Sequence, residues 1–377
     1  MGVTKDIEVT FAERLMKLPP YIFVEIDRKK KEAIARGVDV INLGIGDPDL
    51  PTNPSIVRAM AKAIRNPTYH RYPDTEGMPQ YRQAVADWYK RRFGVQLDAD
   101  KEVLTLIGAK EGVGHLPMAF TNPGDVVLIP DPGYPPYFSG TTFAGGVVHF
   151  MPLRRENGFL PDLKAIPESV ASRAKLMFVN YPNNPTGAVA PIEFYQDVVD
   201  FAYKHNIIVA QDNTYSELAF DGYRARSFME VPGAKEVGIE LHSLSKTFSM
   251  TGWRLGFAVG NPKVIQGLFK IKANLDSGAF NAVQEASIVG LAHCEEIARK
   301  NSKIYQERRD VLVKGLLAVG LDVDYPKASF YVWCPVPKGY DSSSFVAKLI
   351  DGVGVVCTPG KGFGEAGEGY VRFALTT

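Results

Sequence analysis

The sequence has few of the residues on which metal sites and disulfide scaffolds depend. Its 377 residues include three cysteines and six histidines. Cys294, Cys334 and Cys357 lie far apart and form no Cys-x-x-Cys pair, so we interpret them as reduced structural residues. The histidines show no His-Glu-x-x-His or other ligand spacing. We therefore expect neither a metal site nor a metal-dependent mechanism.

The sequence also lacks an excess of charge of one sign and any long apolar run. A formal net charge of +1 provides no basic field for nucleic acid or for an anionic membrane. No uninterrupted apolar run approaches the roughly 18 residues of a membrane span, and the charged segment 1–20 has no apolar core of a signal peptide. We expect a cytoplasmic protein that binds neither nucleic acid nor membrane.

What the sequence does contain is a series of short apolar runs between residues 101 and 260, separated by segments of helix length. The runs are EVLTLIG, DVVLIPDP, VVHFMPL, KLMFVNYP, IIVAQDN, IELHSLS and LGFAVG. Continuous rather than alternating apolar strands are typical of a parallel sheet buried on both faces. The pattern predicts an α/β domain with a mostly parallel seven-stranded sheet flanked by helices. Functional residues of such sheets gather at the carboxyl ends of the strands.

The pattern changes after Pro262, where a long helical stretch at 281–320 is followed by three short strands, ASFYVWCPV, GVGVVCTPG and GYVRFALT. This change predicts a smaller α+β domain. We predict an N-terminal arm and helix at 1–45, packing on the small domain or on a partner subunit. The large α/β domain is expected at 46–275 and the small domain at 276–377.

The segment SLSKTFSMTGWRLG, residues 243–256, follows a predicted strand and combines one lysine with hydroxyl groups and one arginine. A lysine in a partly desolvated, cation-rich pocket loses its proton easily and forms Schiff bases with carbonyls. Ser243, Ser245 and Arg254 supply the donors that a phosphate requires. An aldehyde that carries a phosphate is pyridoxal 5′-phosphate. Lys246 taken alone would be interpreted as a surface lysine.

Polar residues at two other strand ends favour the same cofactor. A pyridinium nitrogen needs an anionic neighbour, and Asp212 follows the run IIVAQ. Asn184 and Tyr215 can donate hydrogen bonds to the phenolic oxygen of the ring. Together these side chains predict a pyridoxal phosphate site at the sheet edge.

Two further segments suit the phosphate and the ring face. In IGAKEG, Gly108, Ala109 and Lys110 follow a strand and open a helix, whose N–H groups and dipole would face a phosphate. In DPGYPPY, Tyr134 is an aromatic side chain that can stack on the ring.

The Gly-x-Gly-x-x-Gly spacing of Gly362, Gly364 and Gly367 mimics a dinucleotide-binding fingerprint. It precedes a strand rather than a helix, so the fingerprint lacks its structural context. We assign the segment to a flexible loop near the mouth of the active site.

These residues carry a resemblance to a known family. Ser243, Ser245, Lys246, Gly252, Arg254 and Gly256 resemble the lysine signature of class I/II pyridoxal-phosphate aminotransferases of fold type I. Asn184, Asp212 and Tyr215 match in family order, and the resemblance covers nearly the whole chain. It implies that Lys246 forms the Schiff base and moves the proton, and that Asp212 pairs with the ring nitrogen. It assigns Asn184 and Tyr215 to the phenolic oxygen, Tyr134 to the ring face, and Ala109, Lys110, Ser243, Ser245 and Arg254 to the phosphate.

The resemblance also implies a homodimer with shared active sites. Tyr72, in HRYPDTEG, matches the tyrosine that family members extend to the phosphate of the neighbouring subunit. Arg372, in GYVRFALT, matches the arginine that binds the α-carboxylate of the substrate. Outside the family context, Arg372 would be a strand-end arginine in a surface ion pair and Tyr72 a core or turn aromatic.

The substrate follows from a narrower resemblance. LPPYIFVEIDRKK, INLGIGDPDLP, GAKEG and DPGYPPY are similar to segments of the LL-diaminopimelate aminotransferases, which make a lysine precursor with glutamate as the usual amino partner. On that resemblance Tyr21, Gly46 and Asn281 line the substrate side, some of them from the neighbouring subunit. It implies amino transfer between LL-diaminopimelate and 2-oxoglutarate in lysine biosynthesis.

Other functions stay open at this point. Within the cofactor class they are an alanine, aspartate or aromatic aminotransferase, or a carbon–sulfur lyase. The segment IKANLDSGAFNAVQ has no arginine where many dicarboxylate-specific relatives carry one, which argues mildly against a dedicated aspartate enzyme. A non-catalytic sensor fused to a DNA-binding head is disfavoured, because only about forty residues precede LGIGDPD and they hold no basic recognition helix. Relatives usually continue into a closing helix after the arginine matched by Arg372, so we expect a trimmed or disordered end.

Overall fold

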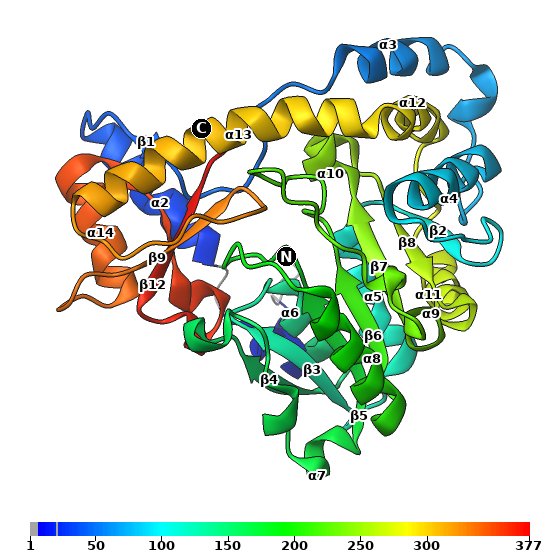
Figure 1. The fold of residues 1–377 in the computed structure, drawn as a ribbon, viewed down its shortest axis with the longest axis horizontal. Coiled ribbons are helices and arrows are strands. Elements are labelled where there is room, and N and C mark those ends of the chain that lie inside the picture. Colours follow the sequence, from blue (N-terminus) through cyan, green and yellow to red (C-terminus); the bar gives the residue numbers. More distant parts are fainter. Residues whose placement is uncertain (1–6, 20–21) are drawn as a thin grey trace, which may run out of the picture.

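Seven strands form one sheet in the order β2-β8-β7-β6-β5-β3-β4 (Figure 1) in a computed structural model that describes residues 7–19 and 22–377. β8 is antiparallel to both of its neighbours, and the other neighbouring pairs are parallel. The predicted mostly parallel seven-stranded sheet is confirmed. The strands are β2 (Val103–Leu106), β3 (Val126–Asp131), β4 (Val147–Pro152), β5 (Ala174–Asn180), β6 (Ile208–Asp212), β7 (Gly238–Ser243) and β8 (Gly256–Gly260).

Helices cover both faces of this sheet, which explains why its central strands are apolar along their whole length. One face packs against α5 (Ala109–Phe120), α6 (Pro136–Phe143) and α11 (Pro262–Leu275). The other packs against α4 (Pro79–Phe93), α8 (Ile192–His205) and α12 (Asn281–Ala292), with α3 (Pro54–Ala63) outside α12. Asn180, Asp212 and Leu241 lie side by side in register, so the carboxyl ends of β5, β6 and β7 share one edge of the sheet.

A second, smaller core surrounds a three-stranded antiparallel sheet in the order β11-β12-β9. Its elements are β9 (Tyr331–Pro335), α14 (Ser342–Val353), β10 (Val355–Val356), β11 (Thr358–Pro359) and β12 (Tyr370–Ala374). The N-terminal part of the chain joins this core: β1 (Ile41–Asn42) pairs with β10, and α2 (Ile22–Ala35) buries Ile26 and Ala33 in it. The N-terminal helix therefore packs on the small domain.

The helix α13 (Cys294–Ala318) runs across the top of the view from one core to the other (Figure 1). Its first turns add Cys294 and Ile297 to the large core, whereas Tyr305 and Val313 belong to the small core. The domain bounds stay predictions. The helix α12, which follows the predicted boundary, packs on α3 and α4.

Short elements complete the described chain. They are α1 (Glu13–Met16), α7 (Glu168–Ala171), α9 (Ala234–Val237), α10 (Leu244–Thr247) and the 3-10 helices η1 (Pro67–His70), η2 (Arg155–Asn157), η3 (Leu163–Ala165), η4 (Phe228–Glu230), η5 (Thr251–Trp253), η6 (Gly360–Phe363) and η7 (Glu365–Gly367). No helix among residues 7–19 and 22–377 is long and apolar enough to cross a lipid bilayer.

Candidate active site

A cavity of about 470 Å³ lies at the carboxyl ends of the central strands, between the two domains. Asn180, Asp212 and Ser243, the last residues of β5, β6 and β7, all line it. The strand ends therefore deliver polar side chains to one place, as the sequence predicts. The predicted residues that line the cavity are Gly46, Ala109, Lys110, Tyr134, Asn184, Asp212, Tyr215, Ser243, Ser245, Lys246, Arg254 and Arg372.

Lys246 reaches the cavity from α10, the short helix that follows β7. The hydroxyl of Ser243 caps this helix by accepting a hydrogen bond from the Ser245 N–H at 3.2 Å. The Lys246 Nζ donates to the Gly46 carbonyl oxygen at 2.8 Å. Burial lowers the pKa of Lys246 to about 8, assisted by the charges of two arginines, Arg372 and Arg254. A useful fraction of this amine is therefore uncharged and nucleophilic near neutral pH.

Asp212 is buried at the end of β6 and accepts hydrogen bonds on both carboxylate oxygens. Oδ1 accepts from the Thr214 hydroxyl at 2.6 Å, and Oδ2 accepts from the Tyr137 hydroxyl at 2.9 Å. Burial raises the pKa of Asp212, while these hydrogen bonds favour the ionised form. Thr214 and Tyr137 were not predicted from the sequence. They fix the orientation of Asp212, which was.

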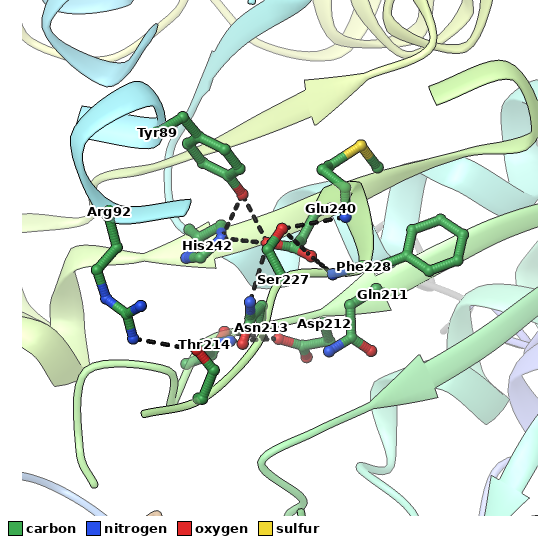
Figure 2. A network of polar contacts seen from close by, with 12 residues as sticks. Tyr89, Arg92, Gln211, Asp212, Asn213, Thr214, Ser227, Phe228, Glu240 and His242 are labelled. Carbon is green, nitrogen blue, oxygen red and sulfur yellow. Dashed lines mark hydrogen bonds and ion pairs between the residues drawn. The ribbon is translucent and has the colours of Figure 1, made fainter. Parts of the chain in front are cut away.

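A buried polar network supports the end of β6, where Asp212 lies (Figure 2). The network lies on the face of the sheet opposite to the Asp212 side chain. Its centre is the fully buried carboxylate of Glu240, on β7. Asn213 donates to Glu240 Oε1 at 2.9 Å and thereby ties the residue after Asp212 to the next strand. Burial raises the pKa of Glu240, but the contact with His242 and the other donors outweighs it, so this pKa lies below its usual value. The remaining contacts of the carboxylate are with the Tyr89 and Ser227 hydroxyls, the Phe228 N–H and His242 Nε2.

The other end of the cavity is suited to an anion. Ala109 and Lys110 form the first turn of α5, whose N–H groups have no carbonyl partner within the helix. The Arg254 Nη1 donates to the Ser245 hydroxyl at 3.4 Å. Gly108 has a φ of +98°, and a Cβ there would lie 2.4 Å from the Arg254 Nη2. Glycine at 108 thus lets the guanidinium approach the start of the helix.

Arg372 is the second arginine of the cavity, and its guanidinium is held on several sides. It is buried on β12 and donates to Asn184 Oδ1 at 2.8 Å and to the Gly44 carbonyl oxygen at 2.9 Å. Its Cζ lies 4.1 Å from the ring centroid of Tyr331 and 4.6 Å from that of Phe363. A guanidinium fixed in this way can bind a carboxylate through two parallel hydrogen bonds.

Tyr331 is a cavity residue that the sequence does not single out. Its hydroxyl lies 3.2 Å from the hydroxyl of Tyr215. A Cβ at position 46 would lie 2.0 Å from the same hydroxyl, so the predicted Gly46 is required for the segment 44–47 to pass Tyr331. Asn180, Thr251 and Phe363 also line the cavity without having been predicted.

Two of the predicted residues that the structure describes do not line this cavity within one chain. Tyr72 is 88% exposed, and Asn281 lies at the start of α12; neither is among the lining residues. Their roles, which would be exerted in a neighbouring subunit, stay predictions. Tyr21 lies outside the described residues.

Comparisons with known proteins point in one direction. The family model for aminotransferase class I and II matches residues 38–377. An LL-diaminopimelate aminotransferase of Syntrophobacter fumaroxidans is 57% identical over 365 residues, which cover 97% of this chain and 94% of that protein. An LL-diaminopimelate aminotransferase of Aquifex aeolicus is 55% identical over 366 residues, covering 97% and 95%. A substrate-bound BacF structure from Bacillus subtilis has a TM-score of 0.93 and 41% identity, covering 98% of this chain and 94% of that one.

Proposed function

Because this chain belongs to the class I and II aminotransferases, we propose that it moves an amino group between LL-diaminopimelate and 2-oxoglutarate with pyridoxal 5′-phosphate as cofactor. The observation that carries the proposal is the convergence of Lys246, Asp212, Arg254 and Arg372 on one cavity. Relatives that carry the name LL-diaminopimelate aminotransferase, more than half identical over nearly the full chain, support the choice of donor.

The donor set of the cavity fits pyridoxal phosphate. The Arg254 guanidinium, the Ser245 hydroxyl and the first N–H groups of α5 would hold the phosphate. The buried Asp212 carboxylate would pair with the ring nitrogen, and the Lys246 amine would hold the aldehyde carbon. When bound, the cofactor supplies an electron-withdrawing ring that accepts the charge left when the substrate loses its Cα proton.

The chain itself supplies binding, orientation and proton transfer. Arg372 would bind the α-carboxylate of the substrate, and its contacts with Asn184 and Gly44 fix where that carboxylate lies. The Lys246 Nζ, whose pKa is about 8, would accept the Cα proton and release it again, because such a pKa lies near the working pH. Thr214 and Tyr137 keep the Asp212 carboxylate oriented during this transfer.

We also propose a homodimer in which Tyr72 and Asn281 reach the site of the neighbouring subunit. The exposure of Tyr72 supports this role, since a large exposed aromatic residue is typical of an interface. The N-terminal arm adds exposed apolar side chains, namely Ile7, Val9, Phe11 and Met16. Exposed apolar side chains that follow one another along a segment favour a surface that another chain covers.

A panel of amino donors with 2-oxoglutarate tests the proposed function. We expect glutamate to form fastest from LL-diaminopimelate, with a kcat/KM at least tenfold above those of alanine, aspartate and aromatic amino acids. A higher kcat/KM for one of these donors would replace the proposed substrate. Release of pyruvate from cystathionine without glutamate formation would indicate a carbon–sulfur lyase instead.

Two arginine variants test the assignment of the cavity ends. Arg254→Ala should weaken retention of pyridoxal phosphate about tenfold or more, because a hydrogen bond to a charged group contributes about 1.5–3 kcal/mol. Arg372→Ala should raise the KM of the amino donor instead and leave retention nearly unchanged. Fluorescence titration of the cofactor-free proteins measures both affinities. The reverse ranking of cofactor affinities would show that the two arginines are misassigned.

The lowered pKa of Lys246 predicts a pH dependence. In cofactor-free protein, the rate of pyridoxal phosphate capture should rise about tenfold between pH 6 and 7 and level off above about 8, since only the uncharged amine is nucleophilic. Stopped-flow absorbance measures this rate. The nearby Asp47 carboxylate raises the Lys246 pKa, so Asp47→Asn should move the midpoint to lower pH. A midpoint near 10 in the wild type would contradict a desolvated amine.

A further inference from the structure

The segment that contains η6 and η7, residues 360–367, belongs to the small domain but touches the large domain beside the cavity. The Gly133 N–H donates to the Phe363 carbonyl oxygen at 2.8 Å. The Ala366 N–H lies 3.2 and 3.3 Å from the two carboxylate oxygens of Asp131, at the end of β3. Gly133 precedes Tyr134, so these contacts join the Tyr134 wall of the cavity to the Phe363 wall.

Gly364 is fitted to this contact. Its φ is +135°, and a Cβ there would lie 1.9 Å from Asp131 Oδ1. Asp131 is itself buried, and burial raises its pKa, with the Glu365 carboxylate acting in the same direction and the Ala366 N–H opposing them. A buried carboxylate without a cationic partner is unfavourable for folding. The contact between Asp131 and residues 364–366 is here named the Asp131 latch. Stability alone therefore does not explain it.

Phe363 connects the Asp131 latch to Arg372. Its ring lies 4.6 Å from the Arg372 Cζ, and the Tyr331 ring lies 4.1 Å from the same atom. The guanidinium thus has aromatic neighbours on β9 and in η6. The main chain of Phe363 is fixed to the large domain by the Gly133 hydrogen bond and, three residues on, by Asp131.

We propose that Asp131 is a positioning residue, which holds Phe363 against Arg372 through the Asp131 latch and so sets the affinity of the site for the α-carboxylate of its substrates. The inference rests on the proposed function, in which Arg372 binds that carboxylate. If Asp131 only held the two domains together, its loss would change stability alone. The loss of a positioning residue changes KM more than kcat.

The test uses the holoenzyme with four variants, Asp131→Ala, Asp131→Asn, Phe363→Leu and the double variant Asp131→Ala/Phe363→Leu. We expect Asp131→Ala to raise the KM of both amino donor and 2-oxo acid about tenfold, with kcat changed less than about threefold and the cofactor absorbance unchanged. Asp131→Asn keeps an acceptor for the Ala366 N–H and should restore most of the affinity. If Asp131 acts through Phe363, the double variant should resemble Phe363→Leu alone.

The outcomes separate the latch from the proposed function. A wild-type enzyme without amino transfer from any donor would reject the proposed function. An active wild type, with unchanged KM in Asp131→Ala or additive effects in the double variant, would overturn the positioning role alone. Gly364→Ala disturbs the same contact from the other side and serves where Asp131→Ala does not fold; its KM should rise in the same way, and an unchanged KM there also overturns the proposal.

Discussion

Replacing Lys246 with alanine should lower the turnover of LL-diaminopimelate by at least about 10³-fold. In the proposed function the side chain both holds the cofactor and carries the proton, and general acid–base catalysis alone contributes about 10²–10⁴-fold. The amine belongs to a residue that lines the cavity, and burial lowers its pKa to about 8. Coupled detection of glutamate under single-turnover conditions measures the loss. Pyridoxal phosphate should still bind, since Arg254 and α5 remain.

Two lysine variants separate nucleophilicity from charge. Lys246→Arg keeps a cation near the Gly46 carbonyl oxygen but stays protonated, so it should be as inactive as Lys246→Ala. Lys263→Ala removes an exposed lysine of α11 and should behave as the wild type. Retention of more than a tenth of the wild-type turnover in Lys246→Ala would remove the lysine from the mechanism.

The fold of the large domain could be predicted from sequence because each strand can be recognised from its own residues. Each of the seven apolar runs contains one strand of the sheet to within a residue, and a central strand buried on both faces is recognisable without knowing its neighbours. The edge strand β4 is largely exposed, although its sequence is an apolar run. The division of the helical stretch 281–320 was not recognisable. Its break is at His293, and α13 carries apolar residues for two different cores, which appear as one continuous helical pattern.

The site was predictable where the chemistry depends on strand ends, and not where it depends on contacts between distant segments. Asp212, Ser243 and Lys246 follow apolar runs, whereas Asp131 meets Ala366 across 235 positions. Tyr331 lies within a strand that shows no polar pattern.

Some missed residues had a signal in the sequence. Thr214 follows Asp212 by two positions, the spacing of a local side-chain hydrogen bond. Glu240 and His242 lie on one face of a strand and alternate with the apolar Ile239 and Leu241, a pattern that indicates a buried polar network. The glycine-rich segment 362–367 does lie beside the cavity, as predicted, but it forms two 3-10 turns, and Phe363 is its contribution to the site.

Asp212→Asn should lower kcat by about 10²–10³-fold while the cofactor stays bound. The amide matches the carboxylate in size but cannot balance a protonated ring nitrogen. A loss of this size corresponds to about 3–4 kcal/mol, at about 1.4 kcal/mol for each tenfold change in kcat. Steady-state rates with LL-diaminopimelate, together with the absorbance of the bound cofactor, measure both effects. Asp212→Glu retains the charge and should keep more activity than Asp212→Asn.

The pH dependence of the same residue provides the sharper test. In the cofactor-free site burial raises the pKa of Asp212, so as pH falls the carboxylate takes up its proton earlier than an exposed aspartate does, and the affinity for pyridoxal phosphate should fall with it. The contribution of Asp212 to stability is larger at low pH, because the folded state binds this proton more tightly than the unfolded chain does. That stabilisation is lost as pH rises through the pKa of the folded state. Acid should therefore weaken cofactor binding without any loss of stability from Asp212. Tyr137→Phe and Thr214→Val each remove a hydrogen bond that favours the ionised form, so their acid limbs should move to higher pH.

An Asp212→Asn enzyme that keeps half of the wild-type kcat would contradict the pairing of this carboxylate with the cofactor.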